Sequence, residues 1–178
     1  MRRAFLFLTI VLLLCTACRH HTPALRSDFT AEEQAILDKS RALIGRAYFG
    51  SLVTHAGDKM MRVRVMEPFA PTDDWIIWLA TNRHSRKVKE IERNPYVSLH
   101  YFDRSSPGYV SLYGRARLVD DSLTKQKIWK KGWEKFYPGR QNYLLIRFEP
   151  ERLEMIDVSG GLPGDSLTWA PYTVILRR

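Results

Sequence analysis

The most informative segment of the sequence is residues 80–99, which read ATNRHSRKVKEIERNPYVSL. It follows an apolar run that is typical of a buried strand. Ser85, Arg86 and Lys87 then begin a helix that Asn94-Pro95 ends. Backbone N–H groups at the start of a helix attract an anion, and a hydroxyl and two cations in the same turn strengthen that attraction. The segment therefore predicts either a phosphate site at this turn or a solvated basic helix.

A second group of cations lies upstream of this segment. Residues 60–66 alternate between apolar and basic side chains, which predicts a strand. Arg62 and Arg64 share one face of that strand, where they meet either solvent or, in a cleft, a phosphate. The Met and Val residues of the opposite face are expected in the core.

On either side of this segment, the sequence predicts short strands joined by short connections. A capping box at residues 30–33 begins a helix over residues 30–45, and two more helices are expected over residues 85–94 and 120–136. Strands are expected over residues 48–53, 60–66, 75–81, 96–102, 109–119, 143–148, 153–158 and 172–176, with a bulge at Gly114. Hairpins dominate without a βαβ repeat, so the fold class is mainly β, a closed or partly closed antiparallel barrel with helices outside.

The first 17 residues have the features of a signal peptide. Arg2 and Arg3 precede an apolar run over residues 4–14, which is shorter than a membrane-spanning helix. The small residues before Cys18 resemble a bacterial lipobox, which implies that Cys18 is lipidated; the alternative is an ordinary cleaved secretory signal. The predicted organisation is a signal peptide over 1–17, a tether over 18–27 and one domain over 28–178, lipid-anchored in a bacterial cell envelope.

The composition suits one folded domain with an acidic ligand. The chain has 178 residues, of which 45% are hydrophobic, and a net charge of +9, so it is neither collagen-like nor a disordered tail protein. After cleavage and acylation at Cys18 the domain holds no free thiol, which excludes disulfides and thiol catalysis inside it. The basic excess would suit nucleic acid, but a tethered envelope protein meets little of it, so no nucleic-acid partner is predicted.

Three parts of the sequence resemble the pyridoxamine 5′-phosphate oxidase family: residues 81–99, residues 109–116, and the pattern over residues 129–154, which is similar to its general stress protein branch. The resemblance covers residues 30–176 and implies an FMN-binding split β-barrel of about 6–7 antiparallel strands, usually a homodimer with FMN at the subunit interface. It implies FMN contacts from Arg64, Val65, Met66, Ala80, Thr81, Ser85, Arg86 and Lys87. Arg64, Arg86 and Lys87 would contact the phosphate with Ser85 nearby, and the other four would line the ribityl chain and ring.

The same resemblance identifies no substrate. Residues 67–69 hold no lysine where the oxidase uses one for its substrate phosphate, so vitamin B6 oxidation is not predicted. The expected function is an FMN-dependent oxidoreductase of unknown small substrate. The alternatives are a non-catalytic flavin-binding protein and a split barrel that binds haem or a deazaflavin. Haem needs an axial histidine, for which His84 and His100 are candidates, although His100 is expected to be structural. No metal site or catalytic residue is predicted.

Overall fold

The computed structural model describes residues 24–57 and 59–177. The signal peptide, Cys18 and the first part of the tether lie outside them. The described elements are α1 (Ala31–Ala47), β1 (Gly50–His55), β2 (Met61–Met66), β3 (Ile77–Asn82), α2 (Arg86–Arg93), β4 (Tyr96–Asp103), β5 (Gly108–Val119), α3 (Ser122–Lys127), the 3₁₀ helices η1 (Trp133–Lys135) and η2 (Pro138–Arg140), β6 (Tyr143–Asp157) and β7 (Tyr172–Ile175). Among these residues, no helix is both long and apolar enough to cross a membrane.

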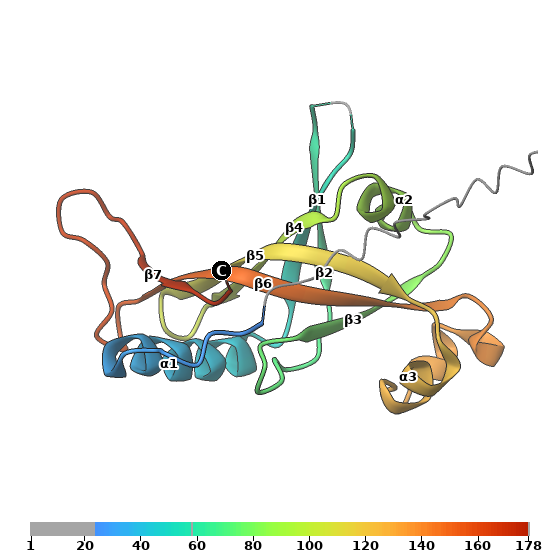
Figure 1. Ribbon diagram of the computed structural model, residues 1–178, viewed down its shortest axis with the longest axis horizontal. Coiled ribbons are helices and arrows are strands. Elements are labelled where there is room, and N and C mark those ends of the chain that lie inside the picture. The colour runs from blue at the N-terminus through green and yellow to red at the C-terminus, as the bar shows by residue number, and fades with distance from the viewer. Residues whose placement is uncertain (1–23, 58, 178) are drawn as a thin grey trace, which may run out of the picture.

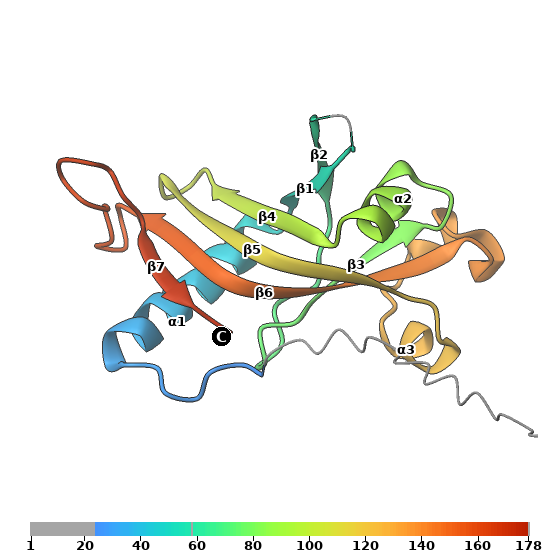
Figure 2. The same cartoon turned by 45° about the horizontal axis from the view of Figure 1, so that its top comes forward.

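The strands form one antiparallel sheet in the order β2-β1-β4-β5-β6-β3, with β7 paired to β6 (Figure 1). The two strands at the ends of this order, β2 and β3, are not neighbours in the ladder, so the sheet remains open between them. Helix α1 runs along one side of the sheet, and α2 connects β3 to β4 near the other end (Figure 2). The prediction of a mainly β, partly closed antiparallel fold is confirmed.

The main core lies between the inner face of the sheet and α1. Leu52, Leu99 and Leu112, from three adjacent strands, are fully buried there with Phe148. Helix α1 begins where the sequence predicts, because the capping box at Thr30 forms in both directions. The burial of the apolar face of α1 against the sheet then holds the helix in place.

Residues 143–157 form one long strand, so the prediction of two strands separated by a turn was wrong. Pro150 has no N–H group to donate, but it pairs with Gly114 at the point where the β5–β6 register shifts. A Cβ on Gly114 would overlap the Glu149 carbonyl oxygen and come within 2.6 Å of the Pro150 Cα. The bulge expected at Gly114 is thus confirmed, and it lets β6 continue through its proline.

The helix expected over residues 120–136 is much shorter than predicted. Helix α3 ends at Lys127, and Gly132 then takes a left-handed conformation with φ of 91° before η1. This turn brings the rings of Trp129 and Trp133 against Tyr143 on β6, with centroid distances of 5.1 and 6.0 Å. A second, smaller core around Tyr143 therefore replaces the predicted helix.

The outer face of β2 is exposed, so the expectation that its Met and Val residues are core was wrong. Met61, Val63 and Val65 point away from the barrel, while Arg62 and Arg64 on the other face are partly buried. At the N-terminal end of the described residues, Leu25 forms an isolated β-bridge with Arg177. The last residues of the predicted tether therefore lie against the folded domain.

Candidate functional site

A cavity of about 430 Å³ lies where β2 and β3 end and α2 begins. The segment around η1 closes one side of it with aromatic rings. Ten residues line it: Val65, Met66, Glu67, Ala80, Thr81, Asn82, Lys87, Trp133, Phe136 and Tyr137. The size falls within the range of small-molecule sites, roughly 300–1,000 Å³.

Five of the eight residues that the sequence analysis assigns to a cofactor line this cavity. They are Val65, Met66, Ala80, Thr81 and Lys87, which come from three elements and meet only in the folded chain. The remaining three are not among its lining residues: Arg64 precedes Val65 on β2, and Ser85 and Arg86 precede Lys87 at the start of α2. The structure therefore brings the two basic segments of the sequence to one place.

Hydroxyl groups and one lysine form a connected group at the start of α2. The Lys87 ammonium donates a hydrogen bond to Thr81 Oγ1 at 3.0 Å, and the Thr81 and Ser85 hydroxyl oxygens are also 3.0 Å apart. Because Ser85 turns toward Thr81, its side chain does not cap α2, and the first turn of the helix contains no acidic residue. The Val88 N–H already donates to the Ser85 carbonyl oxygen at 3.1 Å, so the Arg86 and Lys87 amides are the ones that could meet an external anion.

The surroundings of Lys87 disfavour the positive charge of its ammonium group. Burial lowers the pKa of its ammonium group, the nearby positive charge of Arg64 lowers it further, and Glu90 opposes both. An anion in the cavity would relieve this repulsion, because it would add negative charge beside Lys87. Arg86, in contrast, is exposed, and no described residue forms a hydrogen bond or ion pair with its guanidinium group.

Arg62 and Arg64 bind Glu90, a residue that the sequence analysis did not single out. Each guanidinium donates a hydrogen bond to the Glu90 carboxylate at 2.8 Å, and the Thr54 hydroxyl donates another. Burial alone would raise the pKa of Glu90, but these three hydrogen bonds outweigh it and lower the pKa to about 2. The two arginines thus face a buried carboxylate of α2 rather than open solvent.

Five other lining residues were not predicted from the sequence to form a site: Glu67, Asn82, Trp133, Phe136 and Tyr137. The spacing of Trp133, Phe136 and Tyr137 was visible in the sequence, but in the helix expected there it gave no sign of a cavity wall. Glu67 is held by Lys130 at 2.8 Å and by the Tyr48 hydroxyl at 2.7 Å, and both interactions lower the pKa of its carboxyl group. The one acidic side chain among the described lining residues is therefore already neutralised.

Neither candidate histidine lines the cavity. His84 is exposed, and its backbone N–H donates to the Asn82 side-chain oxygen at 2.9 Å. His100 Nδ1 lies 2.8 Å from the Ser111 hydroxyl on the outer face of the sheet, as expected of a structural histidine. The described residues contain no cluster of three or more His, Cys, Asp or Glu side chains that could hold a metal ion.

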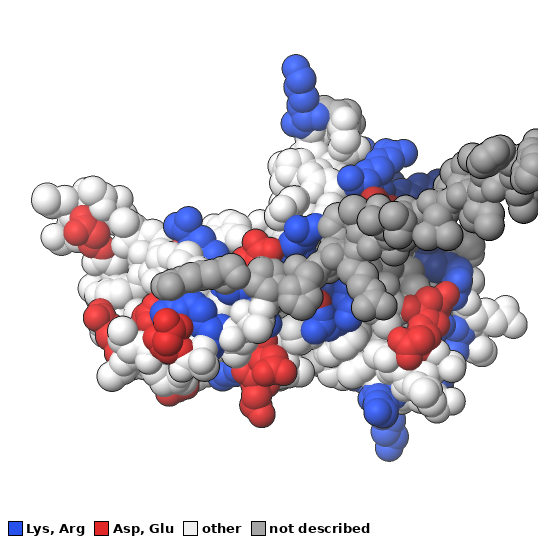
Figure 3. Space-filling model, viewed as in Figure 1, with Lys and Arg blue, Asp and Glu red and all other residues white. Residues whose placement is uncertain are grey.

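Basic and acidic side chains are interspersed on the face of the molecule drawn in Figure 3. Lys and Arg do not form a continuous stripe on this face outside the grey atoms. Nucleic-acid binding relies on such a basic surface, because most of its affinity comes from phosphate contacts. On this face, therefore, the net positive charge is spread over mixed surface.

Three comparisons show which known proteins this chain is similar to. The family model of pyridoxamine 5′-phosphate oxidase matches residues 36–157. General stress protein 26 of Bacillus subtilis is 26% identical over 96 residues, which are 51% of this chain and 69% of that protein. The crystal structure of general stress protein 26 from Bacillus anthracis has a TM-score of 0.63 and 26% identity, with 79% of this chain and 98% of that chain covered.

A second solved structure agrees at the level of the fold alone. It is a pyridoxamine 5′-phosphate oxidase-related, FMN binding protein from Nostoc punctiforme, with a TM-score of 0.58 and 14% identity, covering 85% of this chain and 99% of that one. The family model spans more than half of the chain, including the cavity strands β2 and β3 and helix α2. The chain therefore belongs to the pyridoxamine 5′-phosphate oxidase family.

Proposed function

We propose that this chain is a flavoprotein that binds FMN in the cavity between β2, β3 and α2, and that it is an oxidoreductase acting on a small substrate. The observation that carries the proposal is the composition of this one cavity. A partly buried lysine and two hydroxyl groups lie at its α2 end, and aromatic and apolar side chains line the rest. A phosphorylated ligand with a flat ring needs these two environments side by side.

The phosphate end of FMN would be held by Lys87, Ser85 and Thr81, with the open amides of α2 and the exposed Arg86 beside them. Arg64 would contribute positive charge near Lys87 without contacting the phosphate, because Glu90 holds its guanidinium. Since Lys130 and Tyr48 already engage Glu67, no uncompensated carboxylate among the described lining residues opposes a dianionic phosphate.

The ring of FMN would lie among Val65, Met66 and Ala80, with Trp133 and Tyr137 across the cavity. When bound, FMN supplies hydride transfer at its reactive ring nitrogen. The chain supplies orientation and an apolar wall that excludes water from the ring. The haem alternative is less well supported, because none of the described residues that line the cavity is a histidine. The alternative of a non-catalytic flavin-binding protein differs only in what happens after binding, so substrate-dependent bleaching of bound flavin distinguishes it.

Replacing both Arg86 and Lys87 by alanine is expected to weaken FMN binding at least about 100-fold. Each cation would lose a charge-assisted hydrogen bond to phosphate worth about 1.5–3 kcal/mol, and about 1.4 kcal/mol is a factor of ten. Titration of FMN fluorescence measures the affinity. The matched control is the Lys89→Ala/Arg93→Ala variant, which removes the same charge from exposed positions of α2 and should bind FMN normally. Equal FMN affinity in the wild type and the Arg86/Lys87 variant would refute the proposed site.

We further propose that the chain is a homodimer in which a second copy covers the open side of this cavity. The outer face of the sheet supports this, since Val63, Val65 and Phe102 are each at least 60% exposed on it. Exposed apolar side chains on one continuous face usually mark an interface. Val65 belongs both to this face and to the cavity, so the two surfaces meet.

The N-terminal sequence supports a lipid anchor at Cys18 and a position in a bacterial cell envelope. We expect radiolabelled palmitate to label the wild-type chain in its native host and not to label the Cys18→Ser variant, because acylation needs that thiol. The Cys15→Ser variant is the matched control and should keep the label. A wild-type chain that takes up no palmitate, or a Cys18→Ser chain that does, would contradict the anchor.

A further inference from the structure

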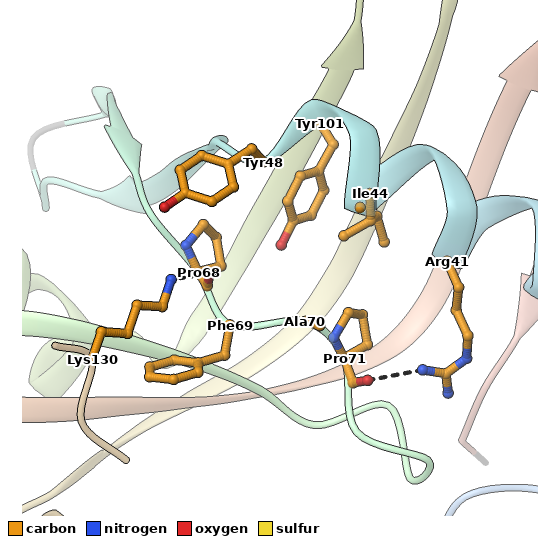
Figure 4. A pocket seen from close by; sticks show the side chains of 10 residues that line it. Arg41, Ile44, Tyr48, Pro68, Phe69, Ala70, Pro71, Tyr101 and Lys130 are labelled. Carbon is orange, nitrogen blue, oxygen red and sulfur yellow. Dashed lines mark hydrogen bonds between the residues drawn. The ribbon is translucent and has the colours of Figure 1, made fainter.

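A second cavity, also of about 430 Å³, lies between the C-terminal half of α1 and the loop that joins β2 to β3. Its walls are mainly apolar, and Figure 4 shows the side chains that form them. The lining residues are Arg41, Ile44, Gly45, Tyr48, Pro68, Phe69, Ala70, Pro71, Tyr101 and Lys130. This cavity is distinct from the proposed flavin cavity, since the two share no lining residue.

The Tyr101 hydroxyl has no hydrogen-bond partner among the described residues, although its residue is only 1% exposed. Figure 4 shows this hydroxyl pointing from the sheet into the space that Ile44, Tyr48 and Phe69 surround. Burial raises the pKa of Tyr101, so the hydroxyl keeps its proton and can donate a hydrogen bond. A buried polar group without a partner costs about 1–3 kcal/mol, and a ligand acceptor would remove that cost.

The charged side chains of this cavity are already engaged. The Arg41 guanidinium donates hydrogen bonds to the carbonyl oxygens of Pro71 and Thr72, both at 2.9 Å. Lys130 forms an ion pair with Glu67 at 2.8 Å and donates to the Pro68 carbonyl at 3.2 Å. The N–H groups of both cations are already taken up by partners within the chain, so an ionised ligand would have to displace these contacts.

We propose that this cavity is a second ligand site, which binds a small uncharged ring compound carrying a carbonyl group, and that Tyr101 donates a hydrogen bond to the carbonyl oxygen. The rings of Phe69, Tyr48 and the two prolines would pack against the ring of the ligand. The cavity also borders the first one, since Glu67 of one holds Lys130 of the other and Phe69 packs edge-on against Trp133 at 5.5 Å. A bound carbonyl compound would therefore lie next to the proposed flavin cavity.

Acetophenone is a probe of this chemistry, and isopropylbenzene is its match in size without the oxygen. In ligand-detected NMR titrations of the purified full chain, we expect acetophenone to bind at least tenfold more tightly than isopropylbenzene. The Tyr101→Phe variant should lose this preference, with acetophenone weakened about tenfold and isopropylbenzene unchanged. The variant should fold normally, because Tyr101 gives up no hydrogen bond within the described chain.

A second variant tests the location of the site. Gly45 lines the cavity, and no heavy atom lies within 4 Å of the position that its Cβ would take. Gly45→Leu should therefore fill the cavity and abolish binding of both probes without destabilising α1, while Gly45→Ala should leave binding nearly unchanged. No flavin is needed for these titrations, so their outcome is separate from that of the FMN titration.

Four results would overturn the proposal. Acetophenone binding that Tyr101→Phe leaves unchanged would show that the hydroxyl does not contact the ligand, and binding that survives Gly45→Leu would place the ligand elsewhere. Failure of acetophenone to bind at all would remove the basis of a carbonyl site. Benzoate binding more tightly than acetophenone would contradict the uncharged class, because the carboxylate would then have displaced the present partners of Arg41 or Lys130.

Discussion

Replacing Glu90 by glutamine is expected to lower the free energy of unfolding by about 3 kcal/mol at pH 7. The Glu90 side chain is 3% exposed and accepts hydrogen bonds from Arg62 and Arg64, each at 2.8 Å, and from Thr54. Glutamine keeps the shape but removes the charge, and its amide N–H group then faces one of the two guanidinium groups. Removing one partner of a buried ion pair costs about 3–5 kcal/mol, and the lower value applies because both arginines reach solvent.

The pH dependence of this effect has a definite sign. In the folded chain the pKa of Glu90 is about 2, below its ordinary value of 4.5. Its contribution to stability is therefore complete above pH 4.5 and is lost as the pH falls through 2, below which both states are protonated. Urea unfolding should show a large difference between the wild type and Glu90→Gln at pH 7, and a much smaller one near pH 3.

Glu92→Gln is the matched control, because it makes the same change at an exposed position of α2. It should alter the free energy of unfolding by less than about 0.5 kcal/mol. If Glu90→Gln behaves like this control, or if its effect is as large at pH 3 as at pH 7, the ion pairs at Glu90 do not stabilise the fold as described. Because Glu90 orients Arg64, the variant should also bind FMN more weakly under the proposed function.

Glu90 shows where sequence reasoning stops. The alternation over residues 60–66 correctly put Arg62 and Arg64 on one face, because strand periodicity is local. Their partner lies 28 residues after Arg62, on a helix whose acidic residues all look alike in sequence. Only the packing of α2 against the β1–β2 hairpin selects Glu90 over Glu92, and that packing is set by the whole sheet.

The same contrast explains the rest of the fold. Helices α1 and α2 and most strands follow from local signals, such as the capping box at Thr30 and the Asn94-Pro95 stop. Pro150 looked like a turn because its tolerance depends on Gly114, which lies 36 positions earlier and faces it across the sheet. The aromatic wall of the cavity was missed because Gly132 bends the chain out of the expected helix. Long-range pairing decided the case of Pro150, and a left-handed glycine decided the case of the aromatic wall.

The exposed outer face of β2 forms part of the proposed dimer interface. Under the proposed homodimer, Val63→Glu should convert the protein from dimer to monomer. Val63 is 64% exposed in the single chain, and it lies in a row with Val53, Ser98 and Tyr113 on the outer face of the sheet. In a symmetric interface each substitution occurs twice, so two unpaired carboxylates would be buried in apolar surroundings, which costs several kcal/mol. Analytical ultracentrifugation measures the change in mass.

Leu123→Glu is the matched control, because Leu123 is 70% exposed on α3, away from this face, and should leave the dimer intact. The exposure of Val63 also predicts that Val63→Glu keeps the circular dichroism spectrum and melting temperature of a folded monomer. Its FMN affinity should fall at least tenfold, since Val65 links this face to the cavity and the second copy would cover the opening. A wild-type chain that sediments as a monomer at every concentration would contradict the dimer. A Val63→Glu monomer with wild-type FMN affinity would instead show that one chain completes the flavin site alone.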